Sequence, residues 1–229
     1  MLNLIINYFI SLSKILYLMR RGVKFDRPFS IRVLGSIKAG KGVFIGSNVT
    51  LIGPVTIGNS VRIENNCEIY RSTLLSNVNI KSNTLLEDTL VEEKSFLGPF
   101  ARVRGNTKIG KLCQIGNFVE IKNSLIGNSV RINHMAFIGD ASIDDNVTIG
   151  AGVITCNHNG HEINQTLIKK GAYIGSNTNL VAPIVIAKNT TIGSGSTITS
   201  DTPEDKLVLA RSKQLVVDNW KRKNSKEER

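Results

Sequence analysis

A histidine and two widely spaced cations are the residues in this sequence best suited to chemistry on an anionic substrate. A neutral imidazole at His134 could accept a proton near neutral pH. Arg104 and Lys122 could bind a phosphate, with Glu120 close to them in the chain. A second polar cluster spans residues 156–159. Single histidines are more often structural than catalytic, so the prediction depends on whether the fold brings these side chains together.

A strict six-residue period predicts the elements that position them. Six residues fit neither a helix nor a simple strand, but they suit a three-sided solenoid in which three hexapeptides make one coil. The repeated residues would then stack as ladders inside, with coils about 4.8 Å apart. The aliphatic members of the three regular runs are Ile45, Leu51, Ile57, Ile63, Ile69, Leu97, Val103, Ile109, Ile115, Ile121, Ile168, Ile174, Leu180, Ile186, Ile192 and Ile198.

Three stretches depart from the period. Between residues 72 and 96 the register is blurred, and the expected ladder residues are Leu74, Ile80, Leu85 and Leu90. Single deletions shorten the unit after Ile121 and the unit after Ile138. Residues 156–166 interrupt the repeat and are expected to form a protruding loop, the kind of segment that often carries binding residues on a rigid scaffold.

The period also assigns residues to faces, which we call A from Leu97, B from Val103 and C from Ile109. Arg104 and Lys122 take equivalent places on face B, 18 residues or one coil apart, and should be neighbours. Stacked like charges repel unless an anion lies between them, which predicts a phosphate there. An ion-paired and solvated surface ladder is the alternative, and the pattern leaves both open.

The edge between faces A and B gathers the remaining candidates. Glu120 and Phe137 both fall at the end of an A unit and should share this edge, with His134 three residues away. On the phosphate hypothesis, Glu120 is left to hold a cationic or hydrogen-bonding group of the same ligand.

The two ends of the chain differ from the repeat, which gives three segments with boundaries at 1–22, 23–201 and 202–229. The first is apolar at helical spacing and ends in Arg20-Arg21. It predicts a helix that caps the solenoid, with an interfacial membrane anchor and a true span as alternatives. The C-terminal extension is expected to form a short strand and a helix, with Trp220 packing back and a solvated tail after it.

Composition narrows the class of protein. The 229 residues carry a net charge of +11, are 41% hydrophobic and only 6% aromatic. Residues 1–41 hold eight basic side chains against one acid, Asp26, which favours an anionic lipid surface or a phosphorylated substrate. No nucleic-acid-binding motif is recognised. Three scattered cysteines indicate a reduced, cytosolic protein without a disulfide framework, and the histidines do not suggest a metal site.

Several motifs in order give a more specific indication. LGPFARVRG (97–105), IGNFVEIKNS (115–124), INHMAFIGDA (132–141), IGAGVITCN (149–157) and YIGSNTNLVAPIVI (173–186), followed by DNW (218–220), resemble the acetyltransferase domain of the bacterial bifunctional enzyme that makes UDP-N-acetylglucosamine. The resemblance covers residues 97–221. The hexapeptide pattern itself resembles that of bacterial acyltransferases. These similarities imply an all-β, left-handed parallel β-helix and a homotrimer.

Roles follow from the resemblance, position by position. The family transfers acetyl from acetyl-CoA to the amine of glucosamine 1-phosphate, and no metal is needed. His134 matches the proton acceptor, and Arg104 and Lys122 match the sugar-phosphate ligands. Substrate-binding positions are completed by Glu120, Phe137 and Thr148, and cofactor positions by Ala151, Asn157, His158, Ser176, Ser194 and Arg211.

Departures from the family pattern concern the acceptor more than the cofactor. On the acceptor side, Phe137 replaces a substrate-binding Tyr of the family, Thr148 replaces an Asn, and Ile163 replaces a Lys of the loop. On the cofactor side, His158 replaces a Tyr and Ser194 replaces an Ala. Gly105, which follows Arg104, replaces a Pro of the family. Lost hydrogen-bonding groups usually change which substrate is accepted. No nucleotidyltransferase segment precedes the repeats, so a separate nucleotidyltransferase is an expected partner.

The expected function is an acetyl-CoA-dependent N-acetyltransferase for an amino-sugar phosphate in cell-envelope polysaccharide synthesis. It would act in the cytoplasm or at the inner face of the membrane. Two alternatives stay open: an acetyltransferase for another amino sugar, nucleotide sugar or sugar hydroxyl, and an inert trimeric scaffold.

Overall fold

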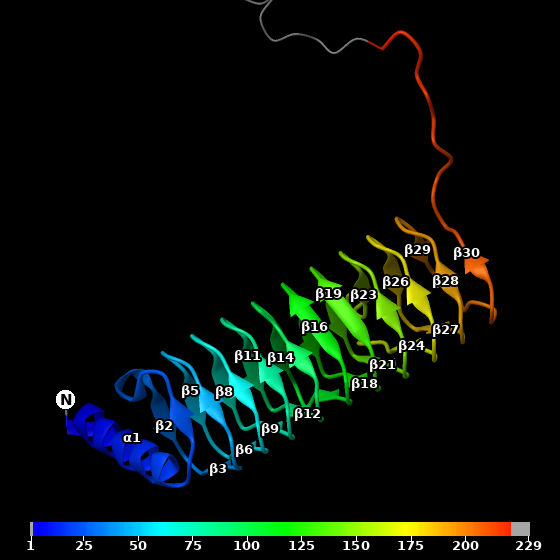
Figure 1. Cartoon of the computed structure of the whole chain (residues 1–229). Coiled ribbons are helices and arrows are strands. Elements are labelled where there is room, and N and C mark those ends of the chain that lie inside the picture. The colour runs from blue at the N-terminus through cyan, green and yellow to red at the C-terminus, as the bar shows by residue number, and fades with distance from the viewer. Residues whose placement is uncertain (1, 221–229) are drawn as a thin grey trace, which may run out of the picture.

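The chain folds into a three-sided prism of stacked coils with one helix across its first end (Figure 1). The computed structural model describes residues 2–220. It is an all-β, left-handed parallel β-helix, as predicted, with α1 (Leu2–Arg20) and one turn of 3-10 helix, η1 (Pro28–Ser30), before the regular coils.

Each face of the prism is one parallel sheet in which a strand pairs with its equivalents in the coils before and after it. Face A is built from short strands, most of them two residues long. They are β1 (Lys24–Phe25), β4 (Phe44–Ile45), β7 (Arg62–Ile63), β10 (Asn79–Ile80), β13 (Phe96–Leu97), β16 (Gln114–Asn117), β19 (Arg131–His134), β22 (Thr148–Ile149), β25 (Tyr173–Ile174), β28 (Thr191–Ile192) and β30 (Leu207–Val208).

Faces B and C complete the triangle. Face B comprises β2 (Arg32–Leu34), β5 (Thr50–Ile52), β8 (Glu68–Tyr70), β11 (Leu85–Glu87), β14 (Arg102–Arg104), β17 (Glu120–Lys122), β20 (Phe137–Gly139), β23 (Ile154–Cys156), β26 (Asn179–Val181) and β29 (Thr197–Ile198). Face C comprises β3 (Ile37–Ala39), β6 (Val55–Ile57), β9 (Thr73–Leu74), β12 (Leu90–Val91), β15 (Lys108–Ile109), β18 (Leu125–Ile126), β21 (Ala141–Ile143), β24 (Thr166–Ile168) and β27 (Ile184–Ile186).

The core is the set of aliphatic ladders that the period predicted. Every aliphatic residue of the three regular runs is buried, from Ile45 to Ile198. Burial of one such side chain contributes about 1.5–3 kcal/mol, so the stacked ladders are the main source of stability. Outward residues alternate with them and form ladders of their own, one side chain per coil.

The irregular stretch follows the same plan with two corrections. Leu74 and Ile80 are buried as predicted, but the other two ladder residues are Leu86 and Val91, not Leu85 and Leu90. All the shortened units fall at one place, the corner between faces B and C. The chain turns there through a single residue with positive φ, namely Arg71, Asp88, Asn123 or Asp140. The sequence analysis placed the two ladder residues one position too early, because the period alone does not show at which corner a coil is shortened.

Helix α1 lies against the first coil, which supports the capping interpretation. Ile15 and Leu18 are buried in the same apolar cluster as Ile31 and Val33 of that coil. The Ser11 hydroxyl donates to the Ile31 carbonyl at 3.3 Å and accepts from the Val33 amide at 2.8 Å. These contacts satisfy backbone groups of a strand that has no neighbour on that side.

The C-terminal extension differs from its prediction. Its short strand exists as β30, but residues 209–220 contain no helix, and Trp220 is 72% exposed instead of packing back. Leu215, Val216 and Val217 are also exposed. A short isolated helix is marginal without an apolar surface to pack on, and this segment leads away from the prism (Figure 1). The predicted solvated tail, residues 221–229, lies outside the described residues.

Candidate active site

The two candidate phosphate ligands are neighbours on face B. Arg104 of β14 and Lys122 of β17 are register partners, as the period predicted. Lys122 is in turn opposite Gly139 of β20. Since successive coils are about 4.8 Å apart, both cations present their charges to the same small area of the outer surface.

Glu120 is bound to this pair more closely than the sequence indicated. Its Oε1 accepts a hydrogen bond from Arg104 Nε at 2.9 Å, and the same oxygen lies 2.8 Å from Arg104 Nη2 and 3.8 Å from Arg102 Nη1 as ion pairs. The sequence analysis left Glu120 free to bind a ligand, and for Oε1 this expectation is wrong because the arginines already occupy that oxygen. All three contacts use this atom, so Oε2 remains available as an acceptor.

Lys122 has a different environment from Arg104. Among residues 2–220, no carboxylate lies within 4.0 Å of its ammonium group. We call Arg102, Arg104, Glu120 and Lys122 the cationic cluster. The cluster contains three cations but only one carboxylate, which pairs with the two arginines, so positive charge is left to attract an anion.

His134 lies at the end of β19, where face A turns into face B, and is exposed. Its Nδ1 is 2.6 Å from Oδ1 of Asn117, its register partner in the preceding coil. An amide oxygen only accepts, so Nδ1 must carry the proton when this bond is made. The Nε2 atom is then the acceptor, and the ring is held in the tautomer that a general base needs.

Most of the predicted cofactor residues form one column along the same corner. The column begins at His134, whose backbone carbonyl accepts from the Gly152 amide in the coil above. The Ala151 carbonyl accepts from the Asn177 amide at 2.7 Å, and the Ser176 carbonyl accepts from the Gly195 amide at 2.8 Å. Arg211 Nη1 continues the column by donating to the Ser194 carbonyl at 2.9 Å.

The length of this corner column suits an elongated ligand. At about 4.8 Å per coil, it rises on the order of 19 Å from His134 to Arg211. We define the corner column as His134, Ala151, Ser176, Ser194 and Arg211. It places three small side chains between an imidazole at one end and a guanidinium at the other.

Asn157 joins the site from the far end of β23. A methyl group at Gly139 would come within 2.8 Å of both Asn157 Nδ2 and the ring of Phe137, so Gly139 leaves the space in which these two side chains meet. Asn157 Nδ2 also donates to Asp140 Oδ2 at 2.6 Å, and Asn123 donates to the other oxygen of Asp140. An amide nitrogen has two protons, so one N–H of Asn157 remains for a ligand.

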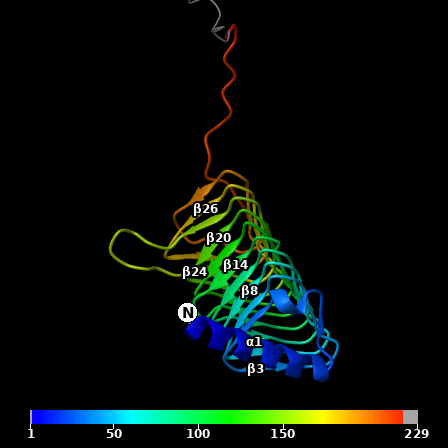
Figure 2. The same cartoon turned by 90° about the vertical axis from the view of Figure 1, so that its left-hand side faces the viewer.

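Two predicted residues lie apart from these groups in the single chain. Thr148 is on the outer side of face A, paired with Arg131 and Tyr173. His158 is exposed in the predicted loop, which projects from the prism between β23 and β24 (Figure 2). One isolated bridge joins His158 to Ile163 and closes this loop.

The corner beside His134 carries exposed apolar side chains in an unusual backbone conformation. Phe100, Phe118 and Met135 occupy it in successive coils, with φ values of 56°, 57° and 49°. They are 49%, 58% and 64% exposed, and the two aromatic rings stack at 5.4 Å. Asn or Gly is the usual residue at such a position. An apolar strip next to the candidate base is typical of a surface that another chain covers.

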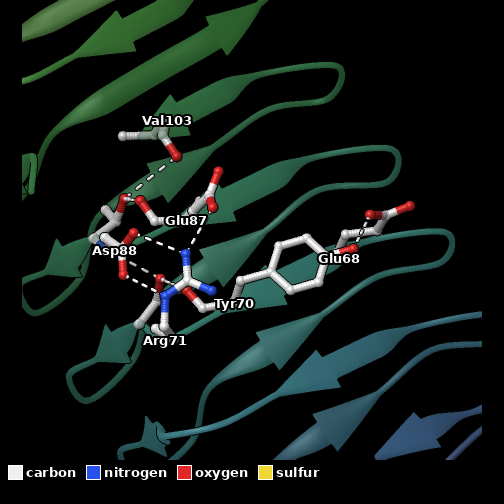
Figure 3. A network of polar contacts seen from close by, with 8 residues as sticks. Glu68, Tyr70, Arg71, Glu87, Asp88 and Val103 are labelled. Atoms are coloured by element: carbon white, nitrogen blue, oxygen red, sulfur yellow. Dashed lines mark hydrogen bonds and ion pairs between the residues drawn. The ribbon is translucent and has the colours of Figure 1, made fainter. Parts of the chain in front are cut away.

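A second polar cluster on face B has the opposite charge (Figure 3). Arg71 Nε donates to Asp88 at 2.7 Å, and its Nη2 donates to Glu87 at 2.6 Å and to Asp88 at 2.9 Å. The Tyr70 hydroxyl donates to Glu68. We call these five residues the acidic network. The bond to Arg71 lowers the pKa of Asp88, and the bond to Glu68, aided by partial burial, raises the pKa of Tyr70 to about 12.

The cysteines do not add a nucleophile or metal ligand. Burial raises the pKa of Cys156, which keeps the thiol of the 156–159 cluster protonated and unreactive. Cys67 and Cys113 are buried ladder residues. Within residues 2–220, no group of three His, Cys, Asp or Glu side chains is placed to hold a metal.

Asn117, Asn123 and Asp140 are site residues that the sequence analysis missed. Asn117 lies 17 residues before His134, one shortened coil, so the register contained the signal. Asp140 is only 8% exposed and has a φ of 49° at the corner of faces B and C. Its partners come from the coils on either side, and pattern alone did not reveal them.

The family model described as the GMPPB C-terminal domain matches residues 33–108. The chain is 44% identical over 208 residues to the bifunctional protein GlmU of Ruthia magnifica subsp. Calyptogena magnifica, covering 91% of this chain and 46% of the relative. It is 42% identical over 205 residues to GlmU of Marinobacter nauticus, with 90% and 45% covered. The similarity thus extends beyond residues 97–221, and the chain spans about half the length of these relatives.

A solved structure supports the same architecture. The UDP-N-acetylglucosamine acyltransferase of Francisella novicida superposes with a TM-score of 0.56 over 79% of this chain and 65% of that protein, at 16% identity. At this level of identity the likeness concerns the fold alone.

Proposed function

Homology to the bifunctional GlmU proteins, over about half of their length, is the premise from which we propose an activity for this chain. We propose that it is an acetyl-CoA-dependent acetyltransferase whose acceptor is the amine of an amino-sugar phosphate resembling glucosamine 1-phosphate, used for cell-envelope precursors. The observation that carries the proposal is the position of the cationic cluster beside the corner column that begins at His134.

The corner column fits the acetyl donor. Small residues and glycines make its surface shallow: a Cβ at Gly150 would lie 2.6 Å from the Ser176 amide nitrogen, and one at Gly175 would lie 2.5 Å from that of Ser194. Arg211 at the upper end is exposed and can meet the anionic part of the cofactor. Ala151, Ser176, Ser194 and Arg211 would hold acetyl-CoA, which supplies the acetyl group as an activated thioester. Thr148 and His158 would reach a ligand from outside this column.

The cationic cluster fits the acceptor. Lys122 has no carboxylate partner among the described residues, and Arg104 keeps guanidinium protons beyond those given to Glu120. A phosphate placed between the two would relieve the repulsion of the stacked charges. Glu120 Oε2 and the ring of Phe137 would then face the sugar, the carboxylate accepting from a hydroxyl or the amine.

The reaction follows from these placements. A protonated amine cannot attack a thioester, so the acceptor nitrogen must lose a proton. His134 Nε2 accepts it, and Asn117 holds the other ring nitrogen through the 2.6 Å contact. The new C–N bond forms as the C–S bond breaks, and the sulfur leaves as a thiol once it is protonated. The free N–H of Asn157 stabilises the charge that develops on the carbonyl oxygen.

We further propose that the chain acts as a homotrimer in the cytoplasm. The exposed strip of Phe100, Phe118 and Met135 beside His134 is the surface that a second copy would cover. Thr148 and His158 lie outside the single-chain site, and a neighbouring copy would let them contribute to it. Unpaired cysteines agree with a reducing compartment.

The test is an assay of free CoA thiol with purified protein, acetyl-CoA and a panel of amino sugars and their phosphates. Glucosamine 1-phosphate should release CoA, and His134→Ala should lower kcat about 100-fold to 10,000-fold, the usual contribution of a general base. His161→Ala is the matched control, because this exposed loop histidine has no assigned role and should leave the rate unchanged.

Two results would replace the proposal. Release of CoA only with other acceptors, including unphosphorylated sugars or hydroxyl groups, would move the activity to a different sugar, and the missing hydroxyl at Phe137 makes this the second candidate. Failure to bind acetyl-CoA at all, measured by calorimetry, would leave a scaffold without catalysis.

A further inference from the structure

Helix α1 has two faces with different surroundings. Its inner face, formed by Ser11, Ile15 and Leu18, packs on the first coil and is buried. The helix lies flat across the end of the prism, so its other face points away from the solenoid (Figures 1 and 2). A helix that caps the solenoid needs apolar side chains only on its inner face, and its outer face usually carries polar residues exposed to solvent.

The outer face of α1 is mainly apolar instead, although it includes the exposed Ser13. Ile6, Phe9, Leu16 and Tyr17 are 45%, 61%, 47% and 54% exposed. Their spacing along a helix of 3.6 residues per turn places them roughly opposite Ser11 and the other inner residues. Ile10 adds further exposed apolar area at the edge of the stripe. Large exposed apolar patches of this kind mark interaction surfaces.

The surroundings of this stripe are strongly basic. Arg20 ends the helix and Arg21 and Lys24 follow it. The first coils carry four more basic residues, and all seven cations are exposed: Arg27, Arg32, Lys38 and Lys41 complete the set. The single acid in residues 1–63 is Asp26. Among the described residues, none of these cations lies within 4.0 Å of a carboxylate.

We propose that the outer face of α1 docks on an anionic lipid bilayer, with the helix in the plane of the interface and the prism standing on the membrane. An apolar stripe rich in aromatic residues with a basic border is the combination that binds such surfaces. No helix within residues 2–220 is long and apolar enough to cross a bilayer. The partner is therefore a surface that the helix lies on.

Charge favours lipid over a second copy of the chain. Two prisms meeting end to end through this stripe would bring Arg20, Arg21 and Lys24 of both copies together without a carboxylate between them. Like charges at such an interface are unfavourable, whereas lipid phosphates neutralise them. The inference stands apart from the proposed acetyltransferase activity, because α1 is far from the cationic cluster along the prism (Figure 1).

The test is co-sedimentation of the full chain with vesicles of phosphatidylcholine containing one quarter phosphatidylglycerol. Phe9→Ser combined with Leu16→Ser should lower the partition coefficient at least tenfold, since both side chains would lose their burial in the interface. Leu207→Ser combined with Leu215→Ser is the matched control, because these leucines are at least as exposed as Phe9 and Leu16 but lie at the opposite end of the chain. It should bind like the unchanged chain.

A charge variant tests the second component. Replacing Arg20, Arg21 and Lys24 by Gln should reduce binding on the order of a hundredfold, as each cation near an anionic surface contributes about a fivefold factor. Binding should also weaken with added salt and with vesicles of phosphatidylcholine alone. Thermal unfolding of each variant shows that the inner face still caps the coil.

Three results would overturn the inference. The unchanged chain could fail to sediment with anionic vesicles, or the Phe9 and Leu16 variant could sediment as well as its control. A doubled molecular mass in sedimentation velocity that the same variant abolishes would assign the stripe to a second copy. Acetyltransferase assays in detergent-free solution are independent of all three outcomes.

Discussion

The acidic network and the cationic cluster lie on the same face of the prism, within a few coils of each other, and yet their charges are arranged differently. In the acidic network every carboxylate has a hydrogen-bond donor, since Arg71 binds Glu87 and Asp88 while Tyr70 binds Glu68. In the cationic cluster, the one carboxylate pairs with Arg102 and Arg104, and Lys122 has no acidic partner among the described residues.

We expect this difference between a structural arrangement and the proposed binding site. The acidic network keeps a net negative charge, but each of its carboxylates already accepts a hydrogen bond from another member, and its exposed ion pairs contribute little stability. In the cationic cluster, Lys122 lacks such a partner among the described residues, and a bound anion would offset the repulsion between the stacked cations. The corner column beside the cationic cluster has no equivalent near the acidic network, where the corner between faces A and B carries Asn66 and Asn83.

Removing one cation from each region should give the largest contrast, measured as the change in KM for the phosphorylated acceptor. Lys122→Ala should raise KM for the phosphorylated acceptor about tenfold to a hundredfold, the range for a hydrogen bond to a charged group, with little change in Tm. Lys122→Arg should restore part of the affinity. Arg71→Ala should leave KM unchanged. An equal loss with the unphosphorylated sugar would contradict a phosphate role for Lys122.

A smaller effect should come from the residue that orients the ring of His134. Asn117→Ala should lower kcat about tenfold by releasing Nδ1. Asn117→Asp keeps an acceptor, but its charge favours the protonated ring, so the acidic limb of the kcat profile should move to higher pH. Tyr70→Phe breaks the analogous bond in the acidic network and should change neither quantity. An unshifted profile for Asn117→Asp would rule out this positioning role.

The smallest effect concerns stability and its dependence on pH. Arg71→Ala should lower Tm by about 2 °C or less at pH 7, because the ion pairs are exposed. The folded-state pKa of Asp88 is lowered, so its contribution is present above the ordinary value of 3.8 and is lost as the pH falls through the folded value. The difference in Tm between the two proteins should therefore vanish below that range. A difference that grows on acidification would show that another group is responsible.

The sequence predicted the ladders well because period and burial have the same cause. An aliphatic residue every six positions can be buried only in a three-sided coil, and the regular runs are buried throughout. The misplacement of Leu85 and Leu90 has a specific reason. A five-residue unit can lose its residue at any corner, and only the hydrogen bonding of neighbouring coils shows that the corner of faces B and C absorbs it.

The candidate site was predictable in part. Arg104 and Lys122 were placed together by counting coils, and the register has them as partners. The sequence did not predict that Glu120 pairs with Arg104, or that Asp140 accepts a hydrogen bond from Asn157. Side chains that differ by one or two positions from the ladder register can reach several neighbours, and the choice depends on rotamers and corner geometry that a repeat does not encode.

The sequence by itself determined the coil, its ladders and the level of each polar residue along the prism, because these follow from a fixed number of residues per turn. The tertiary structure alone decided which donor meets which acceptor. It placed the residues of the corner column in successive coils that are hydrogen-bonded through their backbones, and it showed that α1 covers the first coil with one face while the other stays mainly apolar and exposed. Hydrogen bonds and exposure depend on where each side chain points, whereas the period depends only on the number of residues in each coil.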